Sequence, residues 1–215
     1  MTGSTSDHVE EEIEIGPWAI SLLRPRDVDS LLDDEAFADD EFIPYWAELW
    51  PSGVALAEHV ATLDLGGSRV AELGCGLGLP SLAAALGGAD ALATDWSADA
   101  IVLLERNAAR NGARLRTLTV AWGDPGPLLS LAPFDLVLAA DVLYEARNVE
   151  PLLSLLDTLG TTALVADSGR HHTEAFLAGA AATGWEIVTL CHKRLPRGGI
   201  HRLVPSGRRT PTGGA

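Results

Sequence analysis

Short apolar segments alternate with longer amphipathic segments over most of the chain after residue 50. Short apolar runs are typical of buried strands, whereas apolar residues spaced three and four apart are typical of helices. We therefore predict strands at 68–74, 91–95, 115–121, 134–141, 161–167, 185–190 and 199–205. Helices are predicted at 51–63, 79–88, 97–112, 148–160 and 171–184, and Ser97 is the expected N-cap of the third.

The order of these elements predicts the fold class. Strands that alternate with helices indicate crossover connections on a mostly parallel sheet with helices on both faces. The last two predicted strands are joined by residues 191–198, which are too few for a crossover helix, so these strands should pair antiparallel. The prediction is an α/β fold with a doubly wound, seven-stranded, mostly parallel sheet and an antiparallel last strand.

The N-terminal part of the chain has a strand pattern of another kind. Apolar residues alternate with polar ones on both sides of Gly16-Pro17, which predicts a small hairpin over residues 11–23. Residues 27–43 are acidic and are expected to be partly helical. Polar residues and few apolar ones make residues 1–10 candidates for disorder.

These patterns divide the chain into three parts. Residues 1–50 form an acidic N-terminal arm that contains the hairpin, and residues 51–205 form a ligand-binding domain. Residues 206–215 form a tail that is expected to be disordered.

Composition narrows the class of protein. Of 215 residues, 47% are hydrophobic, enough for a buried core, and the formal net charge is −15. Such an acidic chain is not expected to bind nucleic acid by neutralising phosphates. Its two cysteines form no CxxC pair, which argues against a thiolate metal site. An acidic N-terminus and the absence of long apolar runs predict no signal peptide and no membrane contact, so a cytoplasmic protein is expected.

The first predicted strand of the sheet runs into a glycine turn, VAELGCGLGLPS, with glycines at Gly74, Gly76 and Gly78. Such a turn allows a ligand to approach the backbone. The third glycine of a GxGxxG dinucleotide fingerprint is absent, and a phosphate-binding GxxxxGK[ST] is excluded because the only lysine is Lys193. Glu72 precedes the turn, and its carboxylate favours a ligand with positive charge.

The second strand of the sheet ends at Asp95. A carboxylate at this strand end is suited to accept hydrogen bonds from both hydroxyls of a ribose. Together with the glycine turn, Asp95 indicates a cofactor that contains a nucleoside but lacks a phosphate clamp. S-adenosylmethionine, which combines adenosine, a sulfonium cation and an amino acid, fits these requirements.

Four segments make the assignment more specific: AELGCGLGLPS, TDW, AWGDP and FDLVLAADVLYE. Together they resemble a class I, Rossmann-like, S-adenosylmethionine-dependent methyltransferase of the family-16 lysine methyltransferase group. Within that group, the segments LLRPRD, IPYWAELWPSGVAL and VADSGR are most similar to the electron-transfer-flavoprotein β-subunit lysine methyltransferases. The resemblance implies that the domain at residues 51–205 is the S-adenosylmethionine-binding methyltransferase domain.

The resemblance also implies roles for individual residues at the cofactor. Gly74, Cys75 and Gly76 match the backbone that meets its methionine part. Asp95 matches the acid at the ribose, and Trp50 matches a tryptophan that packs beside the cofactor.

At the adenine and at the target amine, the resemblance implies a second set of residues. Trp122 matches the adenine-side tryptophan, and Ala140 matches a small residue at the end of the fourth strand. Asp141 and Tyr144 match the DxxY motif at the target amine, where Asp141 would orient the nucleophile. Residues 167–170 read DSGR where the family usually has DPGR.

Several of the aromatic and acidic residues in these segments also have a purely structural interpretation. Trp46 and Trp50 could be core or lid aromatics, Tyr144 a core ring with a bonded hydroxyl, and Asp141 a cap for the next segment. His171 and the histidine that follows it lie outside any metal-ligand spacing, so no metal is expected.

Three functions remain open from the sequence. The first is a protein-lysine methyltransferase whose partner is a protein with an exposed lysine, which the resemblance extends to the electron transfer flavoprotein β-subunit. The second is a small-molecule or natural-product methyltransferase on the same scaffold. The third is a non-catalytic, cofactor-binding interaction protein. A nicotinamide-dependent oxidoreductase is disfavoured by the missing third glycine.

Overall fold

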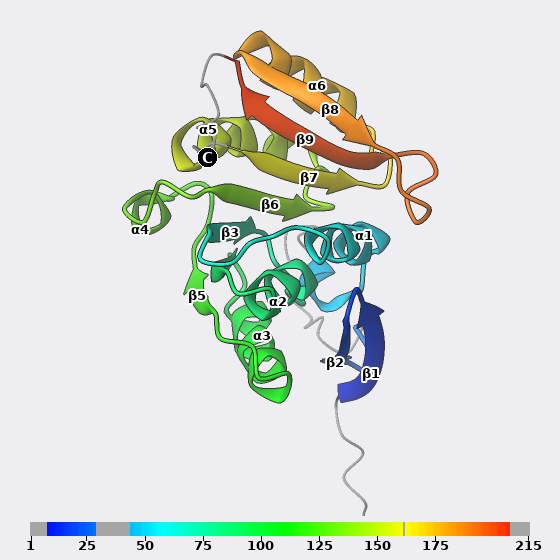
Figure 1. Ribbon diagram of the computed structural model, residues 1–215. Coiled ribbons are helices and arrows are strands. Elements are labelled where there is room, and N and C mark those ends of the chain that lie inside the picture. Colours follow the sequence, from blue (N-terminus) through cyan, green and yellow to red (C-terminus); the bar gives the residue numbers. More distant parts are fainter. Residues whose placement is uncertain (1–7, 29–43, 161, 207–215) are drawn as a thin grey trace, which may run out of the picture.

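Seven strands form one sheet in the order β5-β4-β3-β6-β7-β9-β8 (Figure 1). The computed structural model describes residues 8–28, 44–160 and 162–206. The strands are β3 (Arg69–Leu73), β4 (Asp90–Asp95), β5 (Arg116–Thr119), β6 (Leu136–Ala140), β7 (Ala163–Asp167), β8 (Trp185–Leu190) and β9 (Gly199–Pro205). Strand β9 pairs antiparallel with both neighbours, while the other pairings are parallel. The predicted seven-stranded, mostly parallel sheet with an antiparallel last strand is confirmed.

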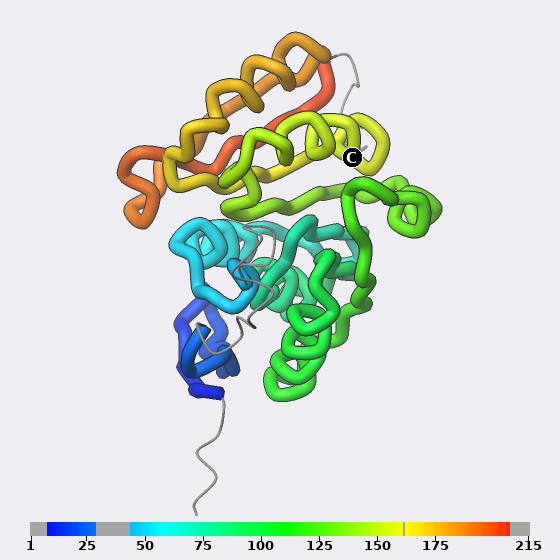
Figure 2. The backbone as a smooth tube through the Cα atoms, turned by 180° about the vertical axis from the view of Figure 1, so that it is seen from behind, coloured from blue at the N-terminus to red at the C-terminus, as the bar shows by residue number. Residues whose placement is uncertain are grey.

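The sheet is doubly wound because helices bury both of its faces. In β6, Leu136 and Leu138 belong to a core shared with helices α1, α2 and α3, whereas Val137 and Ala139 belong to a core shared with α5 and α6. Figures 1 and 2 show these two layers from opposite sides. The helices are α1 (Pro51–Val60), α2 (Leu79–Leu86), α3 (Ala98–Arg110), α4 (Gly126–Leu129), α5 (Val149–Leu159) and α6 (Thr173–Ala182).

The predicted hairpin is formed by β1 (His8–Ile15) and β2 (Trp18–Pro25), paired antiparallel around Gly16. Residues 8–10, expected to be disordered, belong to β1 instead, because the backbone there pairs with Leu23, Arg24 and Pro25. The expectations for residues 1–7, for 29–43 and for the tail beyond residue 206 lie outside the described residues.

Asn107 of α3 and Asn111, the C-cap of that helix, attach the hairpin to the rest of the chain. The side-chain amide of Asn107 accepts from the Leu23 N–H at 2.8 Å and donates to the Leu23 carbonyl at 3.0 Å. Asn111 makes the same pair of bonds with Ser21, both at 2.8 Å. The two amides thus satisfy the free edge of β2 much as a neighbouring strand would.

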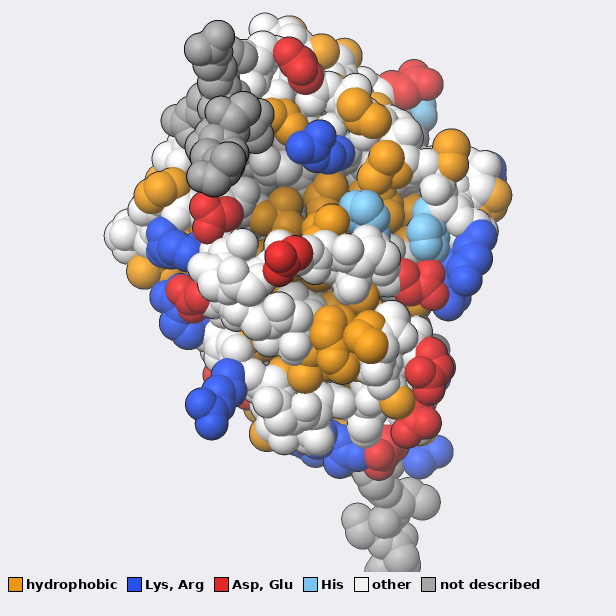
Figure 3. Space-filling view, in the orientation of Figure 1, with side chains coloured by type: hydrophobic (Ala, Val, Ile, Leu, Met, Phe, Trp, Pro, Cys, Tyr) orange, Lys and Arg blue, Asp and Glu red, His pale blue; other side chains and the backbone are white. Residues whose placement is uncertain are grey.

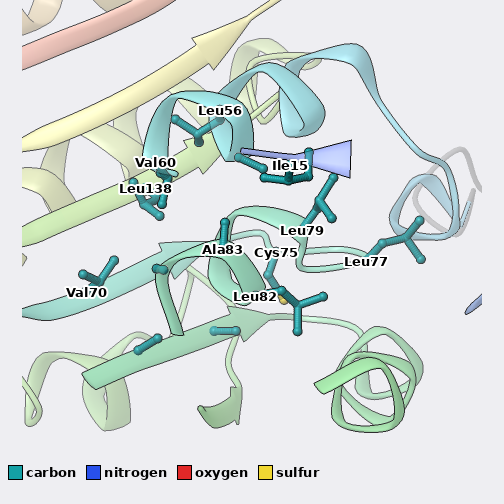
Figure 4. Close-up of a cluster of buried hydrophobic side chains, with 14 of the residues drawn as sticks. Ile15, Leu56, Val60, Val70, Cys75, Leu77, Leu79, Leu82, Ala83 and Leu138 are labelled. Atoms are coloured by element: carbon teal, nitrogen blue, oxygen red, sulfur yellow. The ribbon is translucent and has the colours of Figure 1, made fainter. Parts of the chain in front are cut away.

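Apolar packing completes the attachment. Ile15, Ile20 and Leu22 are fully buried in the core that contains α1 and α2. Figure 4 shows Ile15 among the side chains of that core, near Leu56 of α1 and Leu79 of α2.

Element boundaries differ modestly from the predictions. Helix α1 ends at Val60 and α6 begins at Thr173, so both are shorter than the sequence pattern. The short helix α4 and the single turn η4 (Tyr45–Ala47) were not predicted. Ser97 is the N-cap of α3 as expected, since its hydroxyl accepts from the Ala100 N–H at 3.3 Å.

Strands β3 and β6 are neighbours in the sheet but are separated in the chain by β4 and β5. The connections that follow these two strands therefore leave in opposite directions and open a crevice at the carboxyl ends. None of the helices among the described residues is long and apolar enough to cross a membrane.

Candidate active site

A cavity of about 730 Å³ lies at the carboxyl ends of β3, β4 and β6. The segment that contains η4 and the start of α1 forms another wall. All eleven residues singled out from the sequence line this cavity: Trp50, Glu72, Gly74, Cys75, Gly76, Gly78, Asp95, Trp122, Ala140, Asp141 and Tyr144. Their roles remain predictions, but the fold brings them to one place.

The glycine turn after β3 requires glycine for reasons of backbone and space. Gly76 and Gly78 have φ values of 49° and 73°, in the left-handed region that other residues rarely adopt. A Cβ on Gly78 would lie 2.3 Å from Cδ1 of Leu104, and one on Gly76 would lie 3.0 Å from the Trp46 carbonyl oxygen. Gly78 thus allows α3 to pack closely, whereas Gly76 allows the segment around Trp46 to approach the turn.

Asp95 connects β4 to the glycine turn. Its Oδ2 accepts from the Gly76 N–H and its Oδ1 from the Ser97 N–H, both at 2.9 Å. Burial raises the pKa of Asp95, while the backbone N–H bonds oppose that shift. Each carboxylate oxygen has further lone pairs that can accept from a ligand hydroxyl.

Glu72 is a buried carboxyl group on the same wall. One of its oxygens, Oε2, accepts from the backbone N–H and the hydroxyl of Ser81. Burial raises the pKa of Glu72 to about 8, and the negative charge of Asp95 contributes in the same direction. The carboxyl group is therefore largely protonated at neutral pH, and a nearby cation would favour its ionisation.

Cys75 is buried, and burial raises the pKa of its thiol well above the usual value. A protonated thiol is a poor nucleophile and a poor metal ligand. Among the described residues there is no group of three or more His, Cys, Asp or Glu side chains that could hold a metal ion. Cys75 therefore contributes its backbone and its volume to the wall.

Aromatic rings form another part of the cavity wall. The Tyr45 and Tyr144 rings are 5.0 Å apart between centroids, and the Tyr45 and Trp50 rings are 6.3 Å apart. The Trp50 indole N–H donates to the Tyr45 carbonyl at 2.8 Å. Burial raises the pKa of Tyr144, so its hydroxyl stays protonated and available as a donor.

Asp141, which follows β6, is paired with Arg170. The guanidinium of Arg170 donates from Nε to Oδ1 at 3.0 Å and from Nη2 to Oδ2 at 2.9 Å. Asp141 has a φ of 58° and is 5% exposed. The Arg170 guanidinium carbon also lies 5.2 Å from the centroid of the Trp50 ring.

The DSGR turn at residues 167–170 positions that guanidinium. Asp167 Oδ1 accepts from the backbone N–H groups of Gly169 and Arg170, both at 2.7 Å, and from the Thr173 hydroxyl at 2.6 Å. Ser168, which replaces the proline of the usual DPGR, donates to Asp141 Oδ1 at 3.3 Å. The serine thus adds a contact to the site.

Tyr45, Trp96 and Arg170 are among the residues of the cavity wall that the sequence analysis does not select. Arg170 had a signal in the sequence, because it lies in the DSGR segment that directly follows a predicted strand. Tyr45 had a weaker one in the segment IPYWAELW. Trp96 follows Asp95 and is 51% exposed. In the sequence it is marked only as the last residue of the TDW segment.

A parallel sheet with a glycine turn after one strand, an acid after the next and an aromatic wall over the crevice defines a class of protein, the Rossmann-like methyltransferases. Its fold is shared by the crystal structure of magnesium protoporphyrin IX methyltransferase (ChlM) from Synechocystis PCC 6803 with bound SAM. The TM-score is 0.61 at 19% identity, with 81% of this chain and 98% of that chain covered.

Residues 44–178 match the family model described as lysine methyltransferase. That match covers more than half of the chain, which therefore belongs to the lysine methyltransferase family. The methyltransferase class and the family expected from the sequence are confirmed, and with them S-adenosylmethionine as the cofactor of that class.

Two curated proteins are similar to this chain. An electron transfer flavoprotein beta subunit lysine methyltransferase of Xenopus laevis is 32% identical over 181 residues, 79% of this chain and 68% of that protein. The histone-arginine methyltransferase METTL23 of Xenopus laevis is 30% identical over 153 residues, 67% of this chain and 64% of that protein. The chain thus spans about two thirds of these relatives, whose names specify different target residues.

Proposed function

We propose that this chain transfers the methyl group of S-adenosylmethionine to the side-chain amine of a protein lysine. One observation carries the proposal: the glycine turn and Asp95 share a single cavity with the pair Asp141 and Tyr144. A cofactor held by the first group would therefore face an acceptor held by the second. Family membership supports the lysine as acceptor, since the matched residues 44–178 contain all of these positions.

The residues at the turn fit a nucleoside that carries a sulfonium cation. Asp95 offers lone pairs for ribose hydroxyls, and the ionisable carboxyl of Glu72 favours a cationic ligand. Trp122 would pack at the adenine, and Trp50 and Ala140 would close the space around the rest of the cofactor. When bound, S-adenosylmethionine supplies a methyl group that is already activated on its sulfur.

The task of the protein is then to place the acceptor amine in line with that methyl group. Productive geometry requires reacting atoms at about 3–3.5 Å. Asp141 would accept a hydrogen bond from the amine with lone pairs that Arg170 leaves free. The rings of Tyr45, Trp50 and Tyr144 would keep water away from the amine, which favours its neutral form.

For the target protein, we propose an electron transfer flavoprotein β-subunit or a similar protein met in the cytoplasm. The support is the similarity of LLRPRD, IPYWAELWPSGVAL and VADSGR to those methyltransferases and the 32% identity to the Xenopus laevis relative.

The proposal is tested with S-adenosylmethionine labelled in its methyl group, incubated with the chain and either cell lysate or purified flavoprotein. We expect label in protein, recovered as methyllysine by mass spectrometry, and its loss in the Asp95→Ala variant. Asp95→Ala should weaken cofactor binding by about 1.5–3 kcal/mol, the range for hydrogen bonds to a charged group. Label found only in small molecules would favour a small-molecule methyltransferase. Cofactor binding without any transfer would favour a non-catalytic protein.

A further inference from the structure

The Arg170 guanidinium occupies a defined position in the acceptor half of the cavity. It donates two hydrogen bonds to Asp141 and stacks over the Trp50 ring. The side chain remains 33% exposed and lines the cavity, so it is accessible to an incoming substrate group.

The backbone that carries Arg170 is held by its surroundings. The Arg170 N–H is bonded to Asp167, and the turn before it is covered by the β8–β9 connection. A Cβ on Gly198 would lie 1.9 Å from the Asp167 carbonyl oxygen, and one on Gly169 would lie 2.7 Å from the Arg197 carbonyl oxygen. Because the two segments are in close contact, the backbone that carries Arg170 is held in place, and the bonds to Asp141 and the contact with Trp50 orient its side chain.

The contacts of Arg170 are those that a cationic substrate side chain would seek. A carboxylate and an aromatic face are the two partners that proteins offer to guanidinium and ammonium groups. Here both are already occupied by a residue of the chain. An incoming side chain therefore meets a carboxylate and an aromatic face that the Arg170 guanidinium already contacts.

Other ionisable groups also face this position. Asp141, Asp167 and Tyr45 interact with the Arg170 charge directly. On the remaining walls of the cavity, Glu145 is paired with Arg147 and Glu72 is largely protonated at neutral pH. The remaining ionisable groups on these walls are Glu48, Cys75, Asp95 and Tyr144.

We propose that Arg170 is a specificity-determining residue, which admits the neutral amine of lysine and turns away the permanent cation of arginine. The inference rests on the proposed function and names the acceptor class for the same site. A positive charge within about 4–6 Å disfavours the protonated form of an amine. Lysine can respond by releasing a proton, since the pKa of its amine in water is about 10.4, whereas a guanidinium cannot.

The reaction balances with solvent as the proton acceptor. The lysine ammonium first gives a proton to water. Its nitrogen lone pair then forms the new N–C bond, while the C–S bond of the donor breaks and its electron pair stays on sulfur. The product is a methylammonium group, which the Arg170 charge disfavours in the site and which therefore leaves.

A binding measurement decides the inference without any need for turnover. The probe is n-butylguanidinium, titrated by calorimetry into the chain saturated with S-adenosylhomocysteine. We expect no binding to the native chain and measurable binding to Arg170→Gln, where Asp141 and Trp50 are free to hold the probe. Arg116→Gln is the matched control, since it removes an arginine that is paired with Asp90 on the edge strand β5 and does not line the cavity. Equal binding of the probe by the native chain and Arg170→Gln would overturn the inference.

A kinetic measurement adds a second criterion. At saturating lysine substrate, the rate against pH reports the pKa of the bound amine. Arg170→Gln should move this profile to higher pH, with about a tenfold loss near neutral pH for each pKa unit and recovery in alkali. Arg170→Lys retains the charge and should keep the native profile even if its rate is lower, which separates charge from folding.

Failure of the proposed function and failure of the proposed role of Arg170 would give different results. Absence of methyllysine in every target would refute the proposed function and leave the guanidinium titration to decide the role of Arg170. Methyllysine formation with an unshifted profile in Arg170→Gln would refute the role of Arg170 alone.

Discussion

Three buried carboxyl groups surround the candidate site, and each is stabilised in a different way. Glu72 is stabilised by taking up a proton, since burial raises its pKa to about 8. Asp95 is stabilised by backbone N–H groups, and Asp141 by the guanidinium of Arg170. A buried carboxylate without such compensation would be strongly unfavourable. These differences fit the roles proposed above: Glu72 would contact the cation of the cofactor, Asp95 its ribose hydroxyls, and Asp141 would orient the acceptor amine.

The protonation of Glu72 leads to a prediction about pH. Because its native pKa is raised above the ordinary value of 4.5, its contribution to stability is fully present below about pH 4.5 and is lost as the pH rises through about 8. Glu72→Gln should therefore weaken the decline in stability between these values, as measured by urea unfolding without cofactor. The same variant should bind S-adenosylmethionine several-fold more weakly at alkaline pH. An unchanged pH dependence of unfolding would show that Glu72 does not hold a proton in the native chain.

The acceptor pair gives a second prediction. Asp141→Asn should lower single-turnover methylation by about 100- to 1,000-fold, the loss typical of one positioned polar contact, while cofactor affinity stays unchanged. The asparagine retains the shape but leaves Arg170 without its charge partner. Tyr144→Phe should cost less, because the ring that contacts Tyr45 is retained. Near-native rates in Asp141→Asn would make Asp141 a structural residue.

The sequence predicted those residues of the candidate site that lie in a recognisable motif or at the end of a predicted strand. Asp95 and Asp141 end apolar runs, and the glycines alternate in a turn. Arg170 was harder to recognise, because its role depends on β7 lying beside β6, which no local pattern reveals. Tyr45 lies in a single turn outside the periodic elements, so only the folded chain shows its contacts with Trp50 and Tyr144.

At the scale of elements, the hairpin shows what periodicity can and cannot predict. Alternating apolar residues indicated both strands, and Ile15, Ile20 and Leu22 among them are buried in the core. The place where the hairpin docks was not predictable, because Asn107 and Asn111 look like ordinary polar residues of a helix. Their role depends on the side-chain amide matching the backbone of a strand, which only the fold brings close.

The buried Asn107 therefore provides a prediction about stability. Asn107→Ala removes both amide bonds and leaves the N–H and C=O of Leu23 without partners, so we expect a loss of about 1–3 kcal/mol in the free energy of unfolding. Val102→Ala, on the exposed side of the same helix, is the control and should change the free energy by less than about 0.5 kcal/mol. Hydrogen exchange should show faster opening of the hairpin in Asn107→Ala. Equal stability of the two variants would mean that apolar packing alone holds the hairpin.

At the scale of the whole molecule, the alternation of strands and helices predicted the doubly wound sheet, but not its strand order. Order depends on which side each crossover takes, and the neighbouring positions of β3 and β6 are visible only in the fold. That neighbourhood creates the crevice in which residues as distant in sequence as Trp50 and Arg170 meet. The site is thus a property of the topology, whereas its individual parts are visible in local motifs.

The charge of the whole chain gives the last prediction. The formal net charge is −15, and four glutamates of β1 are exposed on the hairpin: Glu10, Glu11, Glu12 and Glu14. Figure 3 shows acidic side chains gathered over that part of the molecule. Glu10 is paired with Arg110 and Glu11 with Arg24. The carboxylates of Glu12 and Glu14 are exposed and are therefore accessible to a cationic target. Such a field accelerates encounter with a basic protein, and salt screens it.

We therefore expect kcat/KM for a basic protein substrate to fall as ionic strength rises, because the screening length shortens from about 10 Å at 0.1 M to about 3 Å at 1 M. The fall should appear in kcat/KM rather than in kcat, since steering acts on encounter. A short neutral peptide that carries the same lysine is the control and should show little dependence on salt. Charge reversal of Glu12 and Glu14 to lysine should flatten the response to the protein substrate. A kcat/KM that stays constant from low to high salt would show that the negative charge solubilises the chain without attracting its substrate.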